Sequence, residues 1–341
     1  MSKTDKQPLL EVKDLTTHFF TEDGEVHAVD DVDLAVYPGE ILGLVGESGC
    51  GKSVTSLSIM RLISAPGKIL TGQILMGGTD LLQIPESEMM KVRGNRISMI
   101  FQQPQTALNP VFRVGEQIAE VLSIHQDFGK EAGQTRAIDL LKMVGIPEAE
   151  RRAQAFPHEL SGGMAQRVMI AMALACVPEL LLADEPTTAL DVTIQAQILD
   201  LILDMREKMG TSVVLITHDL GVIAETAERV AVMYAGMIVE QADVEELFDH
   251  PYHPYTQGLI GSIPILGKIK DRLDVIPGIV PNLIDPPVGC RFAPRCGARV
   301  KYGLKICTEV QPDLQEAKSG HLVRCWLYES AEGHQAPLKA R

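Results

Sequence analysis

The sequence has little of what a nucleic-acid-binding surface needs. Its 341 residues contain 31 Lys and Arg against 45 Asp and Glu, which gives a formal net charge of -14. Binding to phosphate backbones depends on clustered Lys and Arg, so this charge argues against a nucleic-acid partner, and it also disfavours adsorption to anionic lipid. With one Trp, six Tyr and eight Phe, the chain is also poor in aromatic rings on which bases stack.

Long apolar stretches are missing as well. The opening residues, MSKTDKQPLLEVKD, lack the apolar core of a signal peptide. The longest apolar run, VMIAMALACV at 168–177, is too short to span a bilayer. We therefore expect a cytoplasmic protein that another protein must dock if it works at a membrane.

Residues 1 to about 250 alternate apolar strands with amphipathic helices. Near-continuous apolar runs at 40–46, 97–102, 179–184 and 211–218 are typical of strands buried on both faces of a largely parallel sheet. Helices are predicted over 51–63, 164–176 and 191–210, so the expected fold class is α/β. Over about 103–165 two helical segments follow one another without a strand, which predicts a helical subdomain inserted into the α/β core.

A glycine-rich loop predicts a phosphate site. GESGCGKS at 46–53 follows the strand ILGLV and opens a helix, which is the context of the pattern G-x-x-x-x-G-K-[ST] in P-loop nucleotide hydrolases. The glycines let successive N–H groups face one concavity, while Lys52 is expected to reach the β- and γ-phosphates and Ser53 to ligate Mg²⁺. The expected nucleotide-binding residues are Gly46, Glu47, Ser48, Gly49, Cys50, Gly51, Lys52, Ser53 and Val54.

Two acidic residues follow a later buried strand, in ELLLADEP at 179–186. Asp184 is expected to join the Mg²⁺ shell, and Glu185 to polarise a water for attack on the γ-phosphate. His218 ends the next apolar strand, where an imidazole can contact the γ-phosphate or the attacking water, although a purely structural role is the alternative.

LSGGMAQR at 160–167 lies between these two motifs in the sequence. In this order the three motifs resemble those of the ATP-binding subunit of an ABC transporter, whose signature reads LSGG followed by Gln or Met. Ser161, Gly162 and Gly163 precede a helix expected from about Met164, so their hydroxyl and N–H groups can face a phosphate. The resemblance implies that this phosphate belongs to ATP held by a partner subunit, with two ATP molecules between two subunits.

Other family positions follow from the same resemblance. Gln102 matches the glutamine that touches Mg²⁺ and the water, with Gln103 as the competing surface amide. Asp191 in TTALDV matches an aspartate that crosses the dimer interface. The resemblance therefore implies a hydrolytic half-site that binds ATP and Mg²⁺, the metal being held by Ser53, Gln102 and Asp184.

The adenine-stacking aromatic is less sharply defined. Phe19 in TTHFF matches the family position, but His18 and Phe20 are adjacent candidates, and a core position for Phe19 is an equal alternative.

Longer segments narrow the resemblance to one subfamily. IFQQPQTALNPVFRVGEQI, ADEPTTALDVTIQAQI, HPYTQGLI at 253–260 and a cysteine-bearing tail are similar to the ATPases of bacterial and archaeal oligopeptide and dipeptide importers. This implies a second, homologous ATPase subunit, two transmembrane permease subunits and an extracytoplasmic substrate-binding protein, with the chain peripheral at the cytoplasmic face of the inner membrane. Import of nickel, glutathione or oligosaccharide, an exporter ATPase, and a non-transport ABC protein acting on DNA or ribosomes are the alternatives.

The last part of the chain differs in composition from the rest. Ten of the 20 prolines follow residue 250, so residues 251–341 are expected to form an irregular C-terminal region after an ATP-binding domain of residues 1–250. Four of the six cysteines lie there: Cys290, Cys296, Cys307 and Cys325.

Those four cysteines predict a metal site. Disulfides are disfavoured in the cytosol, and four thiolates suit either Zn²⁺ or a [4Fe-4S] cluster. The tight C-x2-C pair of zinc ribbons is absent, and the tail is similar to family tails that hold a [4Fe-4S] cluster, so the cluster is favoured. Zn²⁺ and free thiols are the alternatives.

Overall fold

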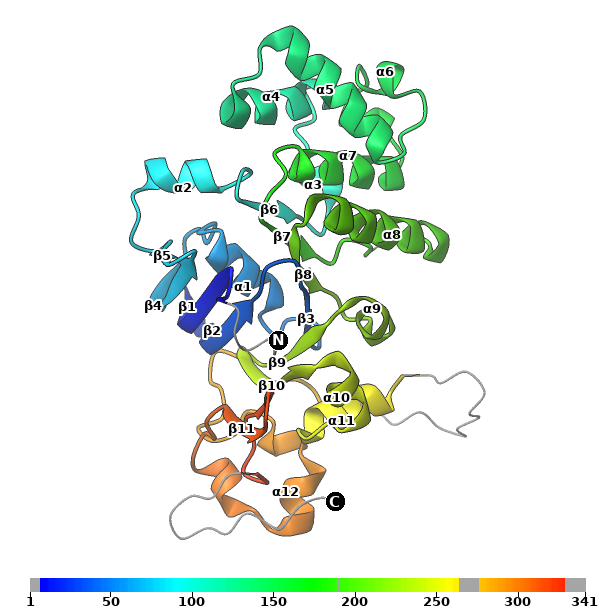
Figure 1. Cartoon of the computed structure of the whole chain (residues 1–341). Helices are drawn as coiled ribbons and strands as arrows, with labels where there is room; N and C mark the ends of the chain where they lie inside the picture. The colour runs from blue at the N-terminus through cyan, green and yellow to red at the C-terminus, as the bar shows by residue number, and fades with distance from the viewer. Residues whose placement is uncertain (1–6, 189, 264–275, 329–341) are drawn as a thin grey trace. The chain divides into compact units, whose positions relative to one another are not determined.

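The computed structural model describes residues 7–188, 190–263 and 276–328 (Figure 1). The chain divides into two compact units. The first comprises Met1–Pro8, Val36–Glu40 and Gln83–Ile216, and the second comprises Leu9–Ala35, Ile41–Leu82 and Thr217–Arg341. Among the helices of the described residues, none combines the length and apolar character needed to cross a membrane.

The first unit contains three parallel strands in the order β8-β7-β6. These are β6 (Ile97–Ile100), β7 (Leu180–Asp184) and β8 (Ser212–Ile216). Every residue of the three strands is buried, as expected for apolar runs covered on both faces. Helix α8 (Val192–Met209) connects β7 to β8 and buries its Ile198, Ile202 and Met205. Three of the four predicted strands are therefore confirmed here.

Helices alone fill the segment between β6 and β7. They are α3 (Pro104–Ala107), α4 (Val114–Gln126), α5 (Lys130–Met143), α6 (Ala149–Arg152), η2 (Pro157–Glu159) and α7 (Gly162–Leu174), and Figure 1 shows them in green shades. Helix α4 packs on α5, with Ile118 and Leu122 facing inward from α4 and Leu140 and Leu141 from α5. Helix α2 (Glu86–Val92) precedes β6.

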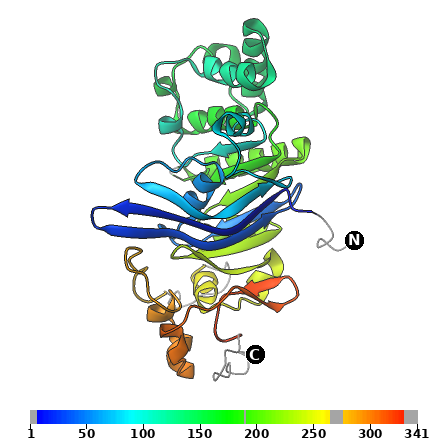
Figure 2. The ribbon, with the colours of Figure 1, turned by 90° about the vertical axis from the view of Figure 1, so that its left-hand side faces the viewer.

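The second unit contains an antiparallel sheet that sequence analysis missed. Its order is β2-β1-β4-β5, formed by β1 (Leu10–Thr21), β2 (Gly24–Val36), β4 (Gly67–Met76) and β5 (Thr79–Asp80). Figure 2 shows β1 and β2 as long neighbouring strands in dark blue. Their apolar residues alternate with polar ones, because one face of each strand is buried and the other is not.

The other strands of the second unit follow the order β11-β12-β10-β9-β3. Strand β3 (Ile41–Val45), the fourth predicted strand, pairs in parallel with β9 (Arg229–Tyr234). Strands β10 (Met237–Asp243), β12 (His321–Val323) and β11 (Gln315–Lys318) continue in antiparallel pairs. Helices α1 (Lys52–Ile59), α9 (Leu220–Thr226), α10 (Val244–Asp249) and α11 (Pro254–Gly261) complete this part.

The C-terminal region is less irregular than its proline content predicts. It has two 3-10 turns, η3 (Ala293–Arg295) and η4 (Lys305–Thr308), the short helix α12 (Gly297–Tyr302), and the strands β11 and β12. The pairing of β12 with β10 joins the end of the described chain to the sheet. The buried Glu240 carboxylate of β10 reinforces this junction, since it hydrogen-bonds the His321 imidazole at 2.7 Å and accepts from the backbone N–H groups of Tyr252 and His253.

Candidate functional site

The loop between β3 and α1 has a backbone that glycine alone fits at two positions. A Cβ on Gly46 would lie 2.1 Å from the Met233 carbonyl oxygen, and one on Gly51 would lie 2.3 Å from the Ala28 carbonyl oxygen. Both residues also have positive φ, at 155° and 109°, and Gly49 has φ 77°. The loop therefore turns sharply, as the glycine pattern predicts.

Lys52 and Gly51 give this loop its positive character. The Lys52 side chain is buried, and its Nζ donates to the carbonyl oxygens of Gly46 at 2.8 Å and Glu47 at 3.1 Å. Gly51 is the N-cap of α1 and has no side chain to occupy the first N–H groups of the helix. A cation and a helix N-terminus thus converge on one loop, which is the arrangement that binds phosphate. Cys50 is buried within it, and burial raises the pKa of its thiol.

The C-terminal region contacts this loop directly. Arg295 donates from two guanidinium nitrogens to the Glu47 carboxylate, at 2.7 and 3.1 Å, and is 8% exposed. The hydrogen bonds to Glu47 raise the pKa of Arg295 above its already high ordinary value. Tyr255 of α11 accepts a hydrogen bond from the Glu47 backbone N–H at 2.8 Å. Side chain and backbone of Glu47 are therefore both held by residues after position 250, a connection that sequence analysis did not detect.

In the first unit, Glu185 follows β7 and is held by two side chains. Gln102 Nε2 and Thr188 Oγ1 each donate to Glu185 Oε2 at 2.8 Å. The Glu185 backbone has φ 45° and its N–H donates to the Ile216 carbonyl oxygen at 3.0 Å. Gln102 rather than its neighbour Gln103 thus contacts the predicted base, whereas sequence analysis did not identify Thr188 as a contact. Asp184, the last residue of β7, is buried.

The LSGG segment begins helix α7. Ser161 is the N-cap, and its hydroxyl accepts a hydrogen bond from the Met164 N–H at 3.4 Å. The helix starts at Gly162, so the prediction of a start near Met164 was wrong by two residues, because the cap bond includes both glycines in the first turn. Ser161 and Gly162 are exposed, which leaves the N-terminus of α7 open to a ligand.

Three further predicted site residues are Asp191, Phe19 and His218. Asp191 caps α8 by accepting from the Ile194 N–H at 3.1 Å. Phe19 is half-buried and pairs in register with Gly67, where a Cβ would come within 2.7 Å of its ring. His218 is exposed in the segment before α9. Phe19 therefore packs in the sheet, and its packing leaves part of the ring accessible.

The four C-terminal cysteines line one small cavity. Cys290, Cys296, Cys307 and Cys325 surround about 10 Å³ of space together with apolar neighbours that include Phe292, Leu304 and Trp326. The cysteines are several residues apart in the sequence. The turns η3 and η4 and a backbone hydrogen bond from Cys290 N–H to the Cys307 carbonyl oxygen at 2.9 Å bring them to the same cavity. The prediction that these cysteines gather in one place is consistent with this cavity.

Burial shifts the pKa values of all four thiols above their ordinary value. It raises the pKa of Cys290 to about 12 and that of Cys307 to about 11, and it raises the pKa values of Cys296 and Cys325 as well. Two groups of three described residues bring possible ligand atoms within 4.8 Å of one another, and neither contains a cysteine.

Comparisons with known proteins identify the family. Residues 29–188 match the family model described as ABC transporter, and residues 239–302 match that of the oligopeptide/dipeptide transporter C-terminal region. A probable peptide ABC transporter ATP-binding protein of Sinorhizobium fredii is 54% identical over 93% of this chain and 94% of its own length. The chain belongs to the ABC transporter ATP-binding subunits.

A further relative covers nearly the whole length of this ABC subunit, and a solved structure covers about two thirds of it. The oligopeptide transport ATP-binding protein AppD of Bacillus subtilis is 53% identical over 96% of this chain and 99% of its own. A dimeric ATP-binding cassette, solved in a post-hydrolysis state with ADP and Pi, is 30% identical with a TM-score of 0.63 and covers 69% of this chain and 98% of its own. The P-loop α/β fold of ABC ATPases is thereby confirmed, and with it the ATP-hydrolysing class.

The Arg295–Glu47 ion pair yields a first prediction for this ABC subunit. Replacing Arg295 by Gln removes the bidentate bond that fixes the second residue of the phosphate loop. We expect the dissociation constant of ATP to rise about 5- to 30-fold, which corresponds to about 1–2 kcal/mol. Titration with a fluorescent ATP analogue measures it.

The matched control is Arg96→Gln. Arg96 also makes a bidentate pair, with Glu179 at 2.6 and 3.1 Å, but it belongs to the first unit and is more exposed. Equal ATP affinity in Arg295→Gln and the wild type would refute a role of this pair in shaping the loop.

Proposed function

We propose that this ABC subunit supplies the ATP-driven step of di- or oligopeptide import. The observation that carries the proposal is similarity over the whole chain, including the C-terminal region, to subunits named for peptide transport. Besides the relatives above, the dipeptide transport ATP-binding protein DppD of Haemophilus influenzae is 49% identical over 93% of this chain. Import of nickel, glutathione or oligosaccharide is the second candidate, because these importers share the subfamily resemblance.

The proposed assembly contains this subunit, a second homologous ATPase, two permease subunits and an extracytoplasmic binding protein. A dimeric solved relative supports the pairing of ATPases. We assign residues 1–250 to the ATP-binding domain, with its helical subdomain at about 103–165, and residues 251–341 to the C-terminal region. Attachment at the cytoplasmic face of the membrane would then pass through the permeases alone.

We assign phosphate binding, Mg²⁺ binding and base catalysis to individual residues. Lys52 would bind the β- and γ-phosphates, and Ser53, Asp184 and Gln102 would hold Mg²⁺. Glu185 would act as general base on the attacking water. The Gln102 amide already donates to Glu185 at 2.8 Å, which orients that carboxylate.

Further residues are proposed to complete the site. His218 would contact the γ-phosphate, and Phe19 would stack on adenine. The exposed N-terminus of α7, with Ser161, Gly162 and Gly163, and Asp191 before α8 would act across the dimer interface on the ATP of the partner subunit. ATP binding would close the dimer, and hydrolysis would reopen it.

Replacing Glu185 by Gln tests the base. The amide keeps the size of the side chain but accepts no proton, so ATP binding should persist while turnover falls by about 10²-fold or more. Steady-state ATPase assays of the purified transporter measure turnover. Glu179→Gln, at the exposed pair with Arg96, should leave the rate unchanged. Full turnover in Glu185→Gln would remove Glu185 from the proposed role.

Uptake assays test the transported solute. Cells lacking this subunit should lose uptake of labelled di- and oligopeptides, and the wild-type chain should restore it. A Lys52→Ala chain should not, because the phosphates lose their cation. Normal peptide uptake in the deleted cells, together with lost uptake of nickel, glutathione or oligosaccharide, would move the assignment to the second candidate.

We further propose that the four cysteines hold a [4Fe-4S] cluster. The four thiols line one cavity and supply the all-thiol donor set that such a cluster needs, one thiolate for each iron. When bound, the cluster would act as a structural clip for a region whose buried apolar cores are only a few residues each.

A Cys296→Ser variant tests the cluster. The chain purified without oxygen should contain about four irons and four sulfides, and Cys296→Ser should lose most of both and become sensitive to proteolysis after residue 250. Cys176→Ser removes a cysteine outside the cavity and should keep the metal content. One zinc per chain, or no metal, would overturn the cluster.

A further inference from the structure

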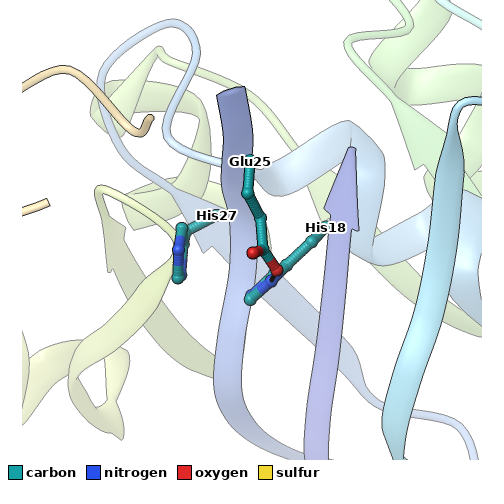
Figure 3. Close-up of side chains that lie close together, drawn as sticks. All are labelled: His18, Glu25 and His27. Atoms are coloured by element: carbon teal, nitrogen blue, oxygen red, sulfur yellow. Dashed lines mark hydrogen bonds and ion pairs between the residues drawn. The ribbon is translucent and has the colours of Figure 1, made fainter. Parts of the chain in front are cut away.

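The β1–β2 hairpin brings three possible metal ligands together. His18 of β1 and Glu25 and His27 of β2 each offer a ligand atom, and these atoms all lie within 4.8 Å of one another (Figure 3). His18 Nδ1 is 2.7 Å from Glu25 Oε1, and the two imidazole centroids are 4.1 Å apart. His18 is buried, while Glu25 and His27 are half-buried, so the cluster is shielded but reachable from solvent.

The Asp30 carboxylate hydrogen-bonds both imidazoles. Asp30 Oδ1 hydrogen-bonds His18 Nε2, and Asp30 Oδ2 hydrogen-bonds His27 Nδ1 at 3.0 Å. The Arg291 guanidinium in turn donates to Asp30 Oδ2 and to the Ala235 carbonyl oxygen, which fixes the carboxylate. Each imidazole therefore has one ring nitrogen engaged by Asp30. His18 Nδ1 hydrogen-bonds Glu25 Oε1, so an ion bound by both of these atoms would replace that hydrogen bond.

This pattern is the one that supports metal-binding histidines. A ligating imidazole commonly gives its second nitrogen to a carboxylate, which sets the tautomer and the ring orientation. Two imidazoles with one carboxylate suit Zn²⁺ and similar transition metals, whereas Mg²⁺ and Ca²⁺ prefer oxygen ligands alone.

We propose that His18, Glu25 and His27 form a binding site for a divalent transition-metal ion such as Zn²⁺, with Asp30 as the outer carboxylate that orients both imidazoles. Three protein ligands leave a further position for water. The ion would cross-link β1 to β2. Through Asp30 and Arg291 the cross-link would extend to the C-terminal region, next to Cys290.

Calorimetric titration of the nucleotide-free full chain with zinc tests this site. Because the four cysteines can also bind zinc, the informative quantity is the difference between variants. The wild type should bind one equivalent more than His27→Gln or Glu25→Gln. Asp30→Asn keeps all three ligands, so it should retain the stoichiometry but weaken affinity by about 10- to 100-fold.

Controls separate the site from general histidine binding and from misfolding. His250→Gln removes an exposed histidine beside Glu246 and should bind as the wild type does. Circular dichroism checks folding, and Glu25→Gln changes a side chain that is 43% exposed, so it keeps the test valid if Asp30→Asn unfolds. The spectrum of Co²⁺ bound to the wild type minus that of Co²⁺ bound to His27→Gln should contain visible bands and no thiolate charge-transfer band. Identical stoichiometry and affinity in the wild type, His27→Gln and Glu25→Gln would overturn the proposal.

Discussion

The ion pair between Arg295 and Glu47 connects the two chemically distinctive parts of the second unit. Glu47 belongs to the phosphate loop, and Arg295 immediately precedes Cys296 in the cysteine-lined region. The arginine is buried, so loss of its partner would leave an uncompensated charge that costs about 3–5 kcal/mol. The geometry of the phosphate loop therefore depends on a region that follows this loop in sequence by more than half the chain.

A second ion pair, between Arg291 and Asp30, connects the cysteine-lined region to the β1–β2 hairpin. Arg291 lies beside Cys290 and binds Asp30, while Arg295 lies beside Cys296 and binds Glu47. A group that held the cysteines in place would therefore also hold the backbone of Arg291 and Arg295. Arg291 binds the β1–β2 hairpin, and Arg295 binds the phosphate loop. A metal clip in the C-terminal region would stabilise the nucleotide loop without touching nucleotide, because the region has little apolar core of its own.

Features with local determinants were predictable from the sequence. The four buried strands, the helices after them and the glycine turn at Gly46 and Gly51 all follow from apolar runs and from backbone that only glycine tolerates. The antiparallel sheet was missed because its half-buried strands lack continuous apolar runs. Gln102 was chosen over Gln103 from the family resemblance, and it is Gln102 that contacts Glu185. The Arg295–Glu47 pair, 248 residues apart, depends on a tertiary contact that leaves no local signal.

If this chain couples ATP hydrolysis to peptide import, the ATPase rate of the reconstituted transporter should depend on peptide. The permeases would be reconstituted in vesicles, with this subunit and its partner ATPase bound on one side of the membrane and the binding protein added on the other. We expect peptide-loaded binding protein to raise the ATPase rate and empty binding protein to leave it unchanged. A rate that ignores peptide but rises with nickel, glutathione or oligosaccharide would contradict this expectation.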